Sequence, residues 1–202
     1  LFNIKIAQRK EFNDNAYHFD VVNDTEKEAK RQCFSSFELN PHQQFVKNYM
    51  SINTPYNSLL LFHGLGTGKT CSAIGISEEM RNYMKQMGIT KKIIIVASPN
   101  VQTNFKQQLF DDRKMEKVGG VWNINGCSGA KFLNEINPIN LMGLSKEKIV
   151  TQVNRIINSY YLFMGYGEFA NYISKKSNVS EDFDPEQREK IKSSRLRNTF
   201  EN

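Results

Sequence analysis

A glycine-rich loop followed by a lysine and a threonine is the part of this sequence whose residue types could do chemistry. Residues 64–70 read Gly-Leu-Gly-Thr-Gly-Lys-Thr. Glycines such as Gly66 and Gly68 reach backbone angles that a Cβ forbids, so consecutive N–H groups can turn inward around phosphate oxygens. Lys69 would place an ammonium against the β and γ phosphates, and the Thr70 hydroxyl could ligate Mg²⁺. The loop therefore predicts binding of a nucleoside triphosphate.

The predicted nucleotide site also includes the turn that follows the loop. A helix expected from residue 69 to about 87 would present its positive N-terminal end to the phosphates. Lys69 and Thr70 are the candidate catalytic residues, and Thr70 is the candidate metal ligand. His63 stands where this motif usually has its first glycine, which disfavours kinases and small GTPases and is accepted by helicase-type ATPases. The loop's candidate binding residues are Gly64, Leu65, Gly66, Thr67, Gly68, Lys69, Thr70 and Cys71.

The segments around the loop predict alternating strands and helices. Residues 58–62 and 92–98 are apolar runs typical of buried strands in a parallel sheet, the first running directly into the loop, and shorter strands are expected at 118–125 and 161–164. Apolar spacing and helix-capping residues predict helices at 26–34, 41–50, 69–87, 101–110, 130–136, 145–160, 168–175 and 185–200. This order indicates an α/β fold whose parallel sheet is flanked by helices and binds its ligand at the carboxyl ends of strands.

Composition limits the class of protein. With 202 residues and 39% hydrophobic content, the chain can form one α/β domain, which we place at residues 39–202 after a polar accessory arm at 1–38. No apolar run approaches the roughly 20 residues that span a bilayer, and the first residues are not a signal peptide, so an intracellular protein without a membrane partner is expected. The net charge of +6 is compatible with a polyanionic binding partner such as nucleic acid, but by itself it is weak evidence for one.

The cysteines give little reason to expect disulfides or a metal site. Cys33, Cys71 and Cys127 are odd in number and lack metal-ligand spacing. Reduced thiols are the expectation for an intracellular protein. Although Cys71 adjoins the phosphate loop, we interpret it as a packing residue.

An acidic strand that would complete an ATPase site is not found in the sequence. Phosphate-loop ATPases hold Mg²⁺ and activate water with a carboxylate at the end of a buried strand. Asp111 and Asp112 follow a predicted helix, and the acids at 181–184 lie in a polar loop. We therefore expect a segment of a longer protein, with the catalytic acid just beyond Asn202, and almost no ATP hydrolysis by the segment alone.

Taken in order, these segments resemble the first RecA-like domain of a superfamily 2 helicase. Residues 39–43 look like the family's adenine-reading Q motif, which implies that Gln43 contacts adenine, and residues 64–70 are similar to motif I. Residues 97–105 resemble motif Ia, which implies nucleic-acid contacts by Pro99, Asn100 and Gln102. Residues 165–169 resemble the Thr-Tyr-x-x-Phe element of the next motif, with glycine replacing threonine at position 165.

The sequence of residues 57–74 and 99–105 is similar to that of helicases of large nucleocytoplasmic DNA viruses, the relatives of the poxvirus early transcription factor small subunit and nucleoside triphosphatase I. The resemblance implies ATP and Mg²⁺ as cofactors and ATP hydrolysis by a helicase or translocase. It also implies nucleic acid as partner, with DNA favoured over RNA, a second RecA-like lobe of the same chain, and the viral transcription machinery. The implied location is the viral factory in the host cytoplasm or the virion.

Other interpretations remain open on the sequence. Another phosphate-loop NTPase, such as a packaging motor or an AAA-type assembly enzyme, would be favoured by a ring hexamer, and a nucleotide-regulated scaffold would lack the catalytic acid. Gln43 could instead cap its own helix, and Asn100 and Gln102 could be ordinary residues at a helix start. His63 is interpreted as a packed or hydrogen-bonded residue rather than a catalyst.

Overall fold

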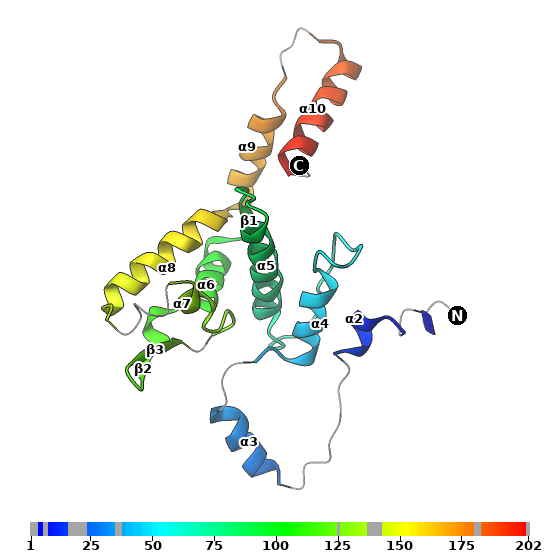
Figure 1. Ribbon diagram of the computed structural model, residues 1–202. Coiled ribbons are helices and arrows are strands. Elements are labelled where there is room, and N and C mark those ends of the chain that lie inside the picture. The colour runs from blue at the N-terminus through cyan, green and yellow to red at the C-terminus, as the bar shows by residue number, and fades with distance from the viewer. Residues whose placement is uncertain are drawn as a thin grey trace. The chain divides into compact units, whose positions relative to one another are not determined.

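The computed structural model describes residues 4–5, 8–15, 24–34, 38–124, 126–136, 143–179 and 183–200. The chain divides into two compact units. The first comprises Leu1–Ile93 and Thr103–Tyr161, and the second comprises Ile94–Gln102 and Leu162–Asn202. Figure 1 shows the elements, which together make a mixed α/β chain with a small parallel sheet.

The first unit is built mainly from helices. Its α-helices are α2 (Lys10–Asn13), α3 (Thr25–Phe34), α4 (Pro41–Tyr49), α5 (Lys69–Gln86), α7 (Lys131–Glu135) and α8 (Lys146–Tyr160), and a short 3₁₀ helix, η1, covers Asp112–Lys114. Helix α6 (Pro99–Leu109) begins in the second unit and ends in the first. The predicted helices at 26–34, 69–87, 130–136 and 145–160 are confirmed within a few residues.

Helix α4 packs on α5. The residues at its N-terminus explain why α4 begins at Pro41. Asn40 and Gln43 form a capping box in which the Gln43 side-chain oxygen accepts the Asn40 N–H at 3.0 Å. Pro41 occupies the first helical position, where its missing N–H leaves no bond unmade. Val46 of α4 and Ile74 of α5 are both buried. The segment before the phosphate loop is thereby held against the helix that follows it.

The core of the first unit continues along α8. The apolar residues of this helix face inward: Ile149, Val153 and Ile157 are buried, and Ile156 is half-buried. Phe132 and Leu133 of α7 are buried as well. These residues hold α7 and α8 in the same core.

Residues 115–124 form a hairpin rather than the single strand expected at 118–125. Strand β2 (Met115–Val118) pairs antiparallel with β3 (Val121–Ile124), with Val118 opposite Val121. The connecting Gly119 and Gly120 have φ values of 58° and 83°. Two successive residues with positive φ are what a two-residue hairpin turn needs, so the Gly-Gly pair was the signal that the sequence interpretation missed.

The second unit contains paired strands and a helical hairpin. Strand β1 (Ile93–Val96) pairs with β4 (Tyr161–Met164), and the Ala97 N–H donates to the Met164 carbonyl at 3.1 Å. Helix α9 (Tyr166–Ser177) is followed by α10 (Pro185–Phe200), and the Phe200 ring lies 6.5 Å from the Phe169 ring. Both strands and both helices were predicted, although β1 is half-buried rather than covered on both faces.

The strand predicted at 58–62 is wrong. No strand forms there, and Leu60 and Phe62 are 87% and 93% exposed. A strand needs a neighbouring strand to satisfy its backbone groups. In the described part of the chain the strand pairs are β1 with β4 and β2 with β3, so residues 58–62 have no sheet neighbour. Residues 59–62 are apolar as the sequence shows, but the neighbouring strand that the prediction required does not form beside them.

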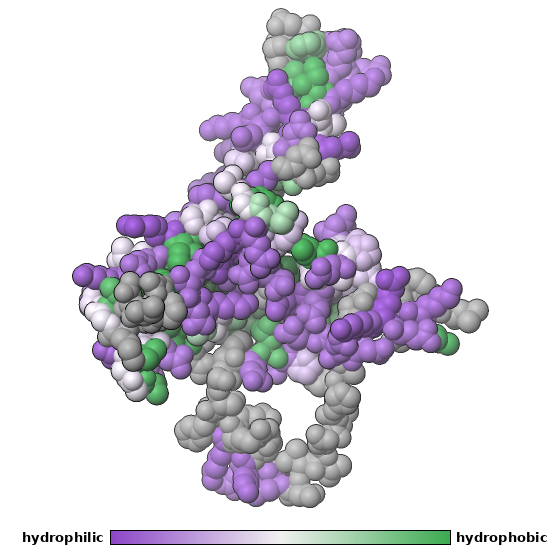
Figure 2. Space-filling model, viewed as in Figure 1, coloured by the Kyte–Doolittle hydropathy of each residue, from purple (hydrophilic) through white to green (hydrophobic). Residues whose placement is uncertain are grey.

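The visible surface is largely polar. Figure 2 shows hydrophilic residues over most of the face in view, with apolar residues in separate spots. Among the residues that the structure describes, no helix is long and apolar enough to cross a lipid bilayer.

Candidate nucleotide-binding site

The phosphate loop has the backbone conformation that its glycines predict. Gly66 and Gly68 have φ values of 77° and 80°, and α5 begins at the next residue, Lys69. The Thr67 hydroxyl donates to the Gly64 carbonyl at 2.9 Å and closes the turn. A Cβ on Gly68 would be strained by the positive φ and would require the side-chain amide of Gln43 to move, so this position favours glycine.

Lys69 lies over the loop that precedes it. Its ammonium donates to the carbonyls of His63 and Gly64 at 2.9 and 2.8 Å, while the side chain remains exposed. Both acceptors are neutral backbone oxygens. An anionic phosphate would add attraction between two full charges, which the bonds from this ammonium to neutral carbonyls lack. The lysine is thus placed at the loop and can exchange these carbonyls for a phosphate.

Two neighbouring side chains of α4 hold the loop. The Gln43 amide nitrogen donates to the Gly68 carbonyl at 3.3 Å, and Gln43 is only 3% exposed. His42 Nε2 lies 2.9 Å from the Thr67 carbonyl and must donate there, because a carbonyl can only accept. The structure therefore places Gln43 at the loop, where it also caps its own helix through Asn40, the alternative that the sequence left open. Its contact with adenine stays a prediction. The role of His42 was missed.

His63 packs beside the same contact. The His42 and His63 rings meet edge to face with centroids 5.6 Å apart. In the described part of the chain, His63 Nδ1 is buried with no hydrogen-bond partner. His63 is therefore a packed residue, in agreement with the sequence interpretation, although its ring is not hydrogen-bonded through this nitrogen.

Thr70 and Cys71 lie in the first turn of α5. Thr70 is half-buried, and its coordination of Mg²⁺ stays a prediction. Within the described ranges, no group of three or more His, Cys, Asp and Glu side chains is placed to hold a metal ion.

The expectation of reduced thiols is wrong for two of the three cysteines. Cys71 and Cys127 form a disulfide, with Cα atoms 5.1 Å apart. They are 56 residues apart in the chain, so only the tertiary fold brings them together. The Cys33 side chain lies outside the described residues.

The predicted nucleic-acid contacts belong to the second unit. Pro99 is the first residue of α6, and the exposed Asn100 and half-buried Gln102 lie in its first turn. The Gln102 amide donates to the Ala97 carbonyl at 2.7 Å, which ties the end of β1 to the helix. Their contact with nucleic acid stays a prediction.

A buried charge network surrounds the middle of α5, and sequence interpretation missed it. The Arg81 guanidinium donates twice to Glu78, at 2.9 and 2.8 Å, and once to Glu135 of α7 at 2.7 Å. Arg81 and Glu78 are both 1% exposed. The Tyr161 hydroxyl donates to Glu78 at 2.6 Å, and Lys85 donates to Glu135 at 2.8 Å. The i,i+3 spacing of Glu78 and Arg81 was a signal for the pair but not for its burial.

The contacts of the network favour the charged forms of Arg81 and Glu135 despite burial. Burial disfavours the charged form of Arg81, but hydrogen bonds and charge from Glu78 and then Glu135 outweigh it and raise the pKa of Arg81. Burial and the charge of Glu78 raise the pKa of Tyr161, which therefore stays a hydroxyl donor. Burial opposes ionisation of Glu135, yet bonds from Lys85 and Arg81 lower its pKa. The stability contributed by Glu135 is present above its ordinary pKa and lost as the pH falls through the lowered value.

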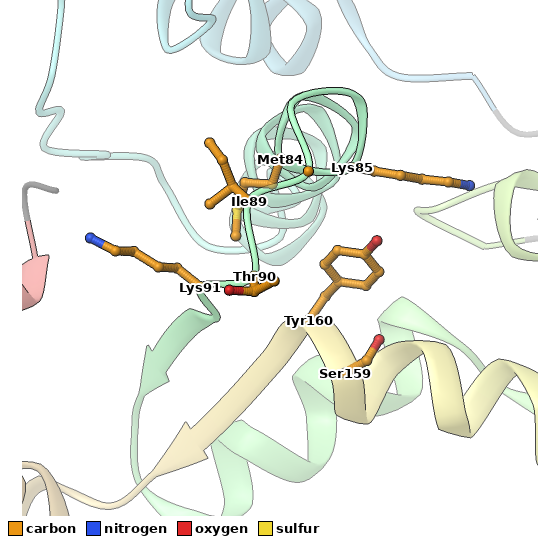
Figure 3. A pocket seen from close by; sticks show the side chains of 8 residues that line it. Met84, Lys85, Ile89, Thr90, Lys91, Ser159 and Tyr160 are labelled. Carbon is orange, nitrogen blue, oxygen red and sulfur yellow. The ribbon is translucent and has the colours of Figure 1, made fainter.

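A cavity of about 310 Å³ lies at the other end of α5, where α8 also ends. Figure 3 shows Tyr160 and Ser159 facing Met84 and Ile89 across it, while the lysines on its rim extend away. It is lined by Met84, Lys85, Gly88, Ile89, Thr90, Lys91, Ser159 and Tyr160. None of the predicted site residues lines this cavity, so it is separate from the phosphate loop.

Comparison with known proteins finds relatives in viruses. No protein-family model and no solved structure matches the chain. A protein of Acanthamoeba polyphaga mimivirus named "Putative ATP-dependent RNA helicase R563" is 28% identical over 170 residues, which are 82% of this chain and 26% of the relative. "Putative helicase 009L" of Frog virus 3 is 28% identical over 137 residues, covering 67% of this chain and 12% of the relative.

A third relative is named for transcription. The "Early transcription factor large subunit homolog" of African swine fever virus is 27% identical over 152 residues, which are 72% of this chain and 13% of the relative. The chain thus spans between about a tenth and about a quarter of the length of these three proteins. The loop at the head of α5 occurs in a chain that is similar to proteins named as putative helicases of large DNA viruses and to one named as an early transcription factor homolog.

Proposed function

We propose that this chain is the ATP-binding lobe of an ATP-dependent nucleic-acid helicase or translocase of a large DNA virus. The observation that carries the proposal is the position of Lys69, exposed at the head of α5 and bonded to the carbonyls of a loop with two left-handed glycines. The helix N-terminus and the loop N–H groups would bind the phosphates, and Lys69 would add the positive charge. Mg²⁺ would be held by Thr70 and would neutralise charge on the phosphates.

We also propose that the protein acts in viral transcription. A relative named as an early transcription factor subunit homolog supports a part in viral transcription. The sequence of the motifs at 57–74 and 99–105 resembles that of the poxvirus early transcription factor small subunit and nucleoside triphosphatase I. We place the domain at residues 39–202, after the accessory arm 1–38, and assign it a RecA-like fold. Its partners would be a second RecA-like lobe, nucleic acid contacted through Pro99, Asn100 and Gln102, and the viral transcription machinery, in the viral factory or virion.

The proposal is tested by the phosphate dependence of nucleotide binding. Calorimetric titration with Mg·ATP, Mg·ADP and AMP is expected to show an affinity for ATP about 100-fold or more above that for AMP. The β and γ phosphates make the charge-assisted bonds to Lys69, and a bond to a charged group contributes about 1.5–3 kcal/mol. Equal affinities for ATP and AMP would contradict a phosphate-binding loop.

Replacing Gln43 with alanine is expected to weaken ATP binding more than GTP binding. An amide has two N–H groups and two oxygen lone pairs, so the bonds to Gly68 and Asn40 leave capacity for one donor and one acceptor contact to adenine. Guanine reverses that pattern. Competition of ATP and GTP for a fluorescent nucleotide measures the difference.

The matched control is Gln44→Ala. Gln44 is the next residue of the same helix, and its amide bonds to Asn48 at 2.8 Å, away from the loop. We expect Gln44→Ala to leave both nucleotide affinities unchanged. If Gln43→Ala weakens both nucleotides equally, Gln43 acts only as a cap of α4 and a support of the loop.

A further inference from the structure

The disulfide joins the phosphate-loop helix to a distant part of the chain. Cys71 is the third residue of α5 and directly follows Thr70. Cys127 lies in the loop between β3 and α7 and is 8% exposed. The crosslink therefore attaches to the first helical turn, whose N–H groups would face a bound phosphate.

The loop that carries Cys127 is firmly held. The Ser128 hydroxyl donates to the Leu109 carbonyl at 2.7 Å, and both residues are buried. The Gly129 N–H donates to the Gly126 carbonyl at 2.7 Å. Cys127 is thus a fixed point to which the first turn of α5 is tied.

Ion pairs further along α5 attach it to α7, the helix that follows the loop carrying Cys127. Glu135 of α7 bonds to Arg81 and Lys85, ten and fourteen residues beyond Cys71. The loop at 64–69 is largely exposed, and the contacts that hold it, such as those from His42 and Gln43, are hydrogen bonds rather than covalent links. Without the disulfide, the ion pairs would still hold the middle of α5, but its first turn would lose its covalent tie.

We infer that Cys71 and Cys127 form a reversible dithiol–disulfide site that controls the order of the phosphate loop. In the disulfide form the first turn of α5 is fixed and the loop is pre-organised around the position of the phosphates. In the dithiol form the first turn and the loop fluctuate more. The effect on nucleotide affinity rests on the proposed function, whereas the crosslink and its effect on loop order do not.

The chemistry is thiol–disulfide exchange with a small-molecule disulfide as oxidant. The Cys71 thiol loses its proton, and its thiolate, stabilised by the helix N-terminus, attacks the oxidant to form a mixed disulfide and release one thiol. The Cys127 thiolate then attacks the Cys71 sulfur, closes the protein disulfide and releases the second thiol. Two protein thiols have lost two electrons and two protons, which the oxidant has accepted. Two equivalents of the thiol form of the oxidant reverse both steps.

The experiment compares the whole chain in oxidised and reduced glutathione buffers at fixed pH. Peptide mapping by mass spectrometry locates the crosslink, and amide hydrogen exchange follows peptides that cover residues 64–75. Calorimetry measures Mg·ATP affinity under both conditions. We expect a Cys71–Cys127 crosslink after oxidation, and on reduction about tenfold faster exchange and about tenfold weaker ATP binding, since one or two backbone residues regain freedom.

Two cysteine variants provide the controls. Cys127→Ser cannot form the crosslink and is expected to behave like the reduced chain in both buffers, while Cys33→Ser is expected to respond like the wild type. Free Cys71 and Cys127 thiols after oxidation, or the same exchange rates in both buffers, would overturn the inference. If exchange responds to the crosslink but neither form binds ATP, the redox site stands and the proposed function fails. ATP affinities equal within twofold would overturn the control of nucleotide binding.

Discussion

Mg·ATP affinity is expected to fall by about 100-fold or more when Lys69 is replaced with alanine, while the free energy of unfolding changes by less than about 0.5 kcal/mol. The Lys69 side chain is exposed, and its bonds are to the carbonyls of His63 and Gly64, which water can replace. The same ammonium supplies the point charge for the phosphates. Calorimetric titration and urea denaturation measure the two quantities.

A second lysine variant separates this local effect from net charge. Lys148 is an exposed residue of α8, and Lys148→Ala removes the same formal charge without touching the phosphate loop. We expect its ATP affinity to equal that of the wild type. A Lys69→Ala chain that retains full affinity would show that residues 64–70 do not bind phosphate, whatever their backbone conformation.

Replacing Arg81 with alanine is expected to lower the free energy of unfolding by about 3–5 kcal/mol. The substitution leaves Glu78 buried without its two guanidinium bonds and removes one of the bonds to Glu135. It also removes the guanidinium from the faces of Phe132 and Tyr160, whose ring centroids lie 4.8 and 5.4 Å from Cζ. Urea denaturation followed by circular dichroism measures the loss.

The matched control is an exposed pair with the same spacing. Lys192 and Glu189 of α10 are also an i,i+3 pair, with their charged atoms 3.6 Å apart and side chains 42% and 75% exposed. Lys192→Ala should change stability by less than about 0.5 kcal/mol, because exposed pairs contribute little. In a Glu78→Gln, Arg81→Met chain no unpaired charge remains, so part of the lost stability should return. A loss below 1 kcal/mol for Arg81→Ala would show that solvent reaches the site.

Local sequence predicted most of the helices and the conformation of the phosphate loop. Capping residues, apolar spacing and glycines act through neighbours within a few positions, as at Asn40, Gly66 and Gly68. Local sequence could not predict the structure of residues 58–62, because a strand forms only if another segment pairs with it. The Gly119-Gly120 hairpin was local and could have been found.

The sequence by itself determined the conformation of the loop at 64–70, with Gly66 and Gly68 in the left-handed region and Lys69 at the head of a helix, because these features depend on residues adjacent in the chain. Only the tertiary structure decided which distant groups support that helix. Cys71 meets Cys127 across 56 residues, and Arg81 meets Glu135 across 54. Such pairs depend on how loops and helices pack around a shared core, and neither residue type nor periodicity specifies a partner at that separation.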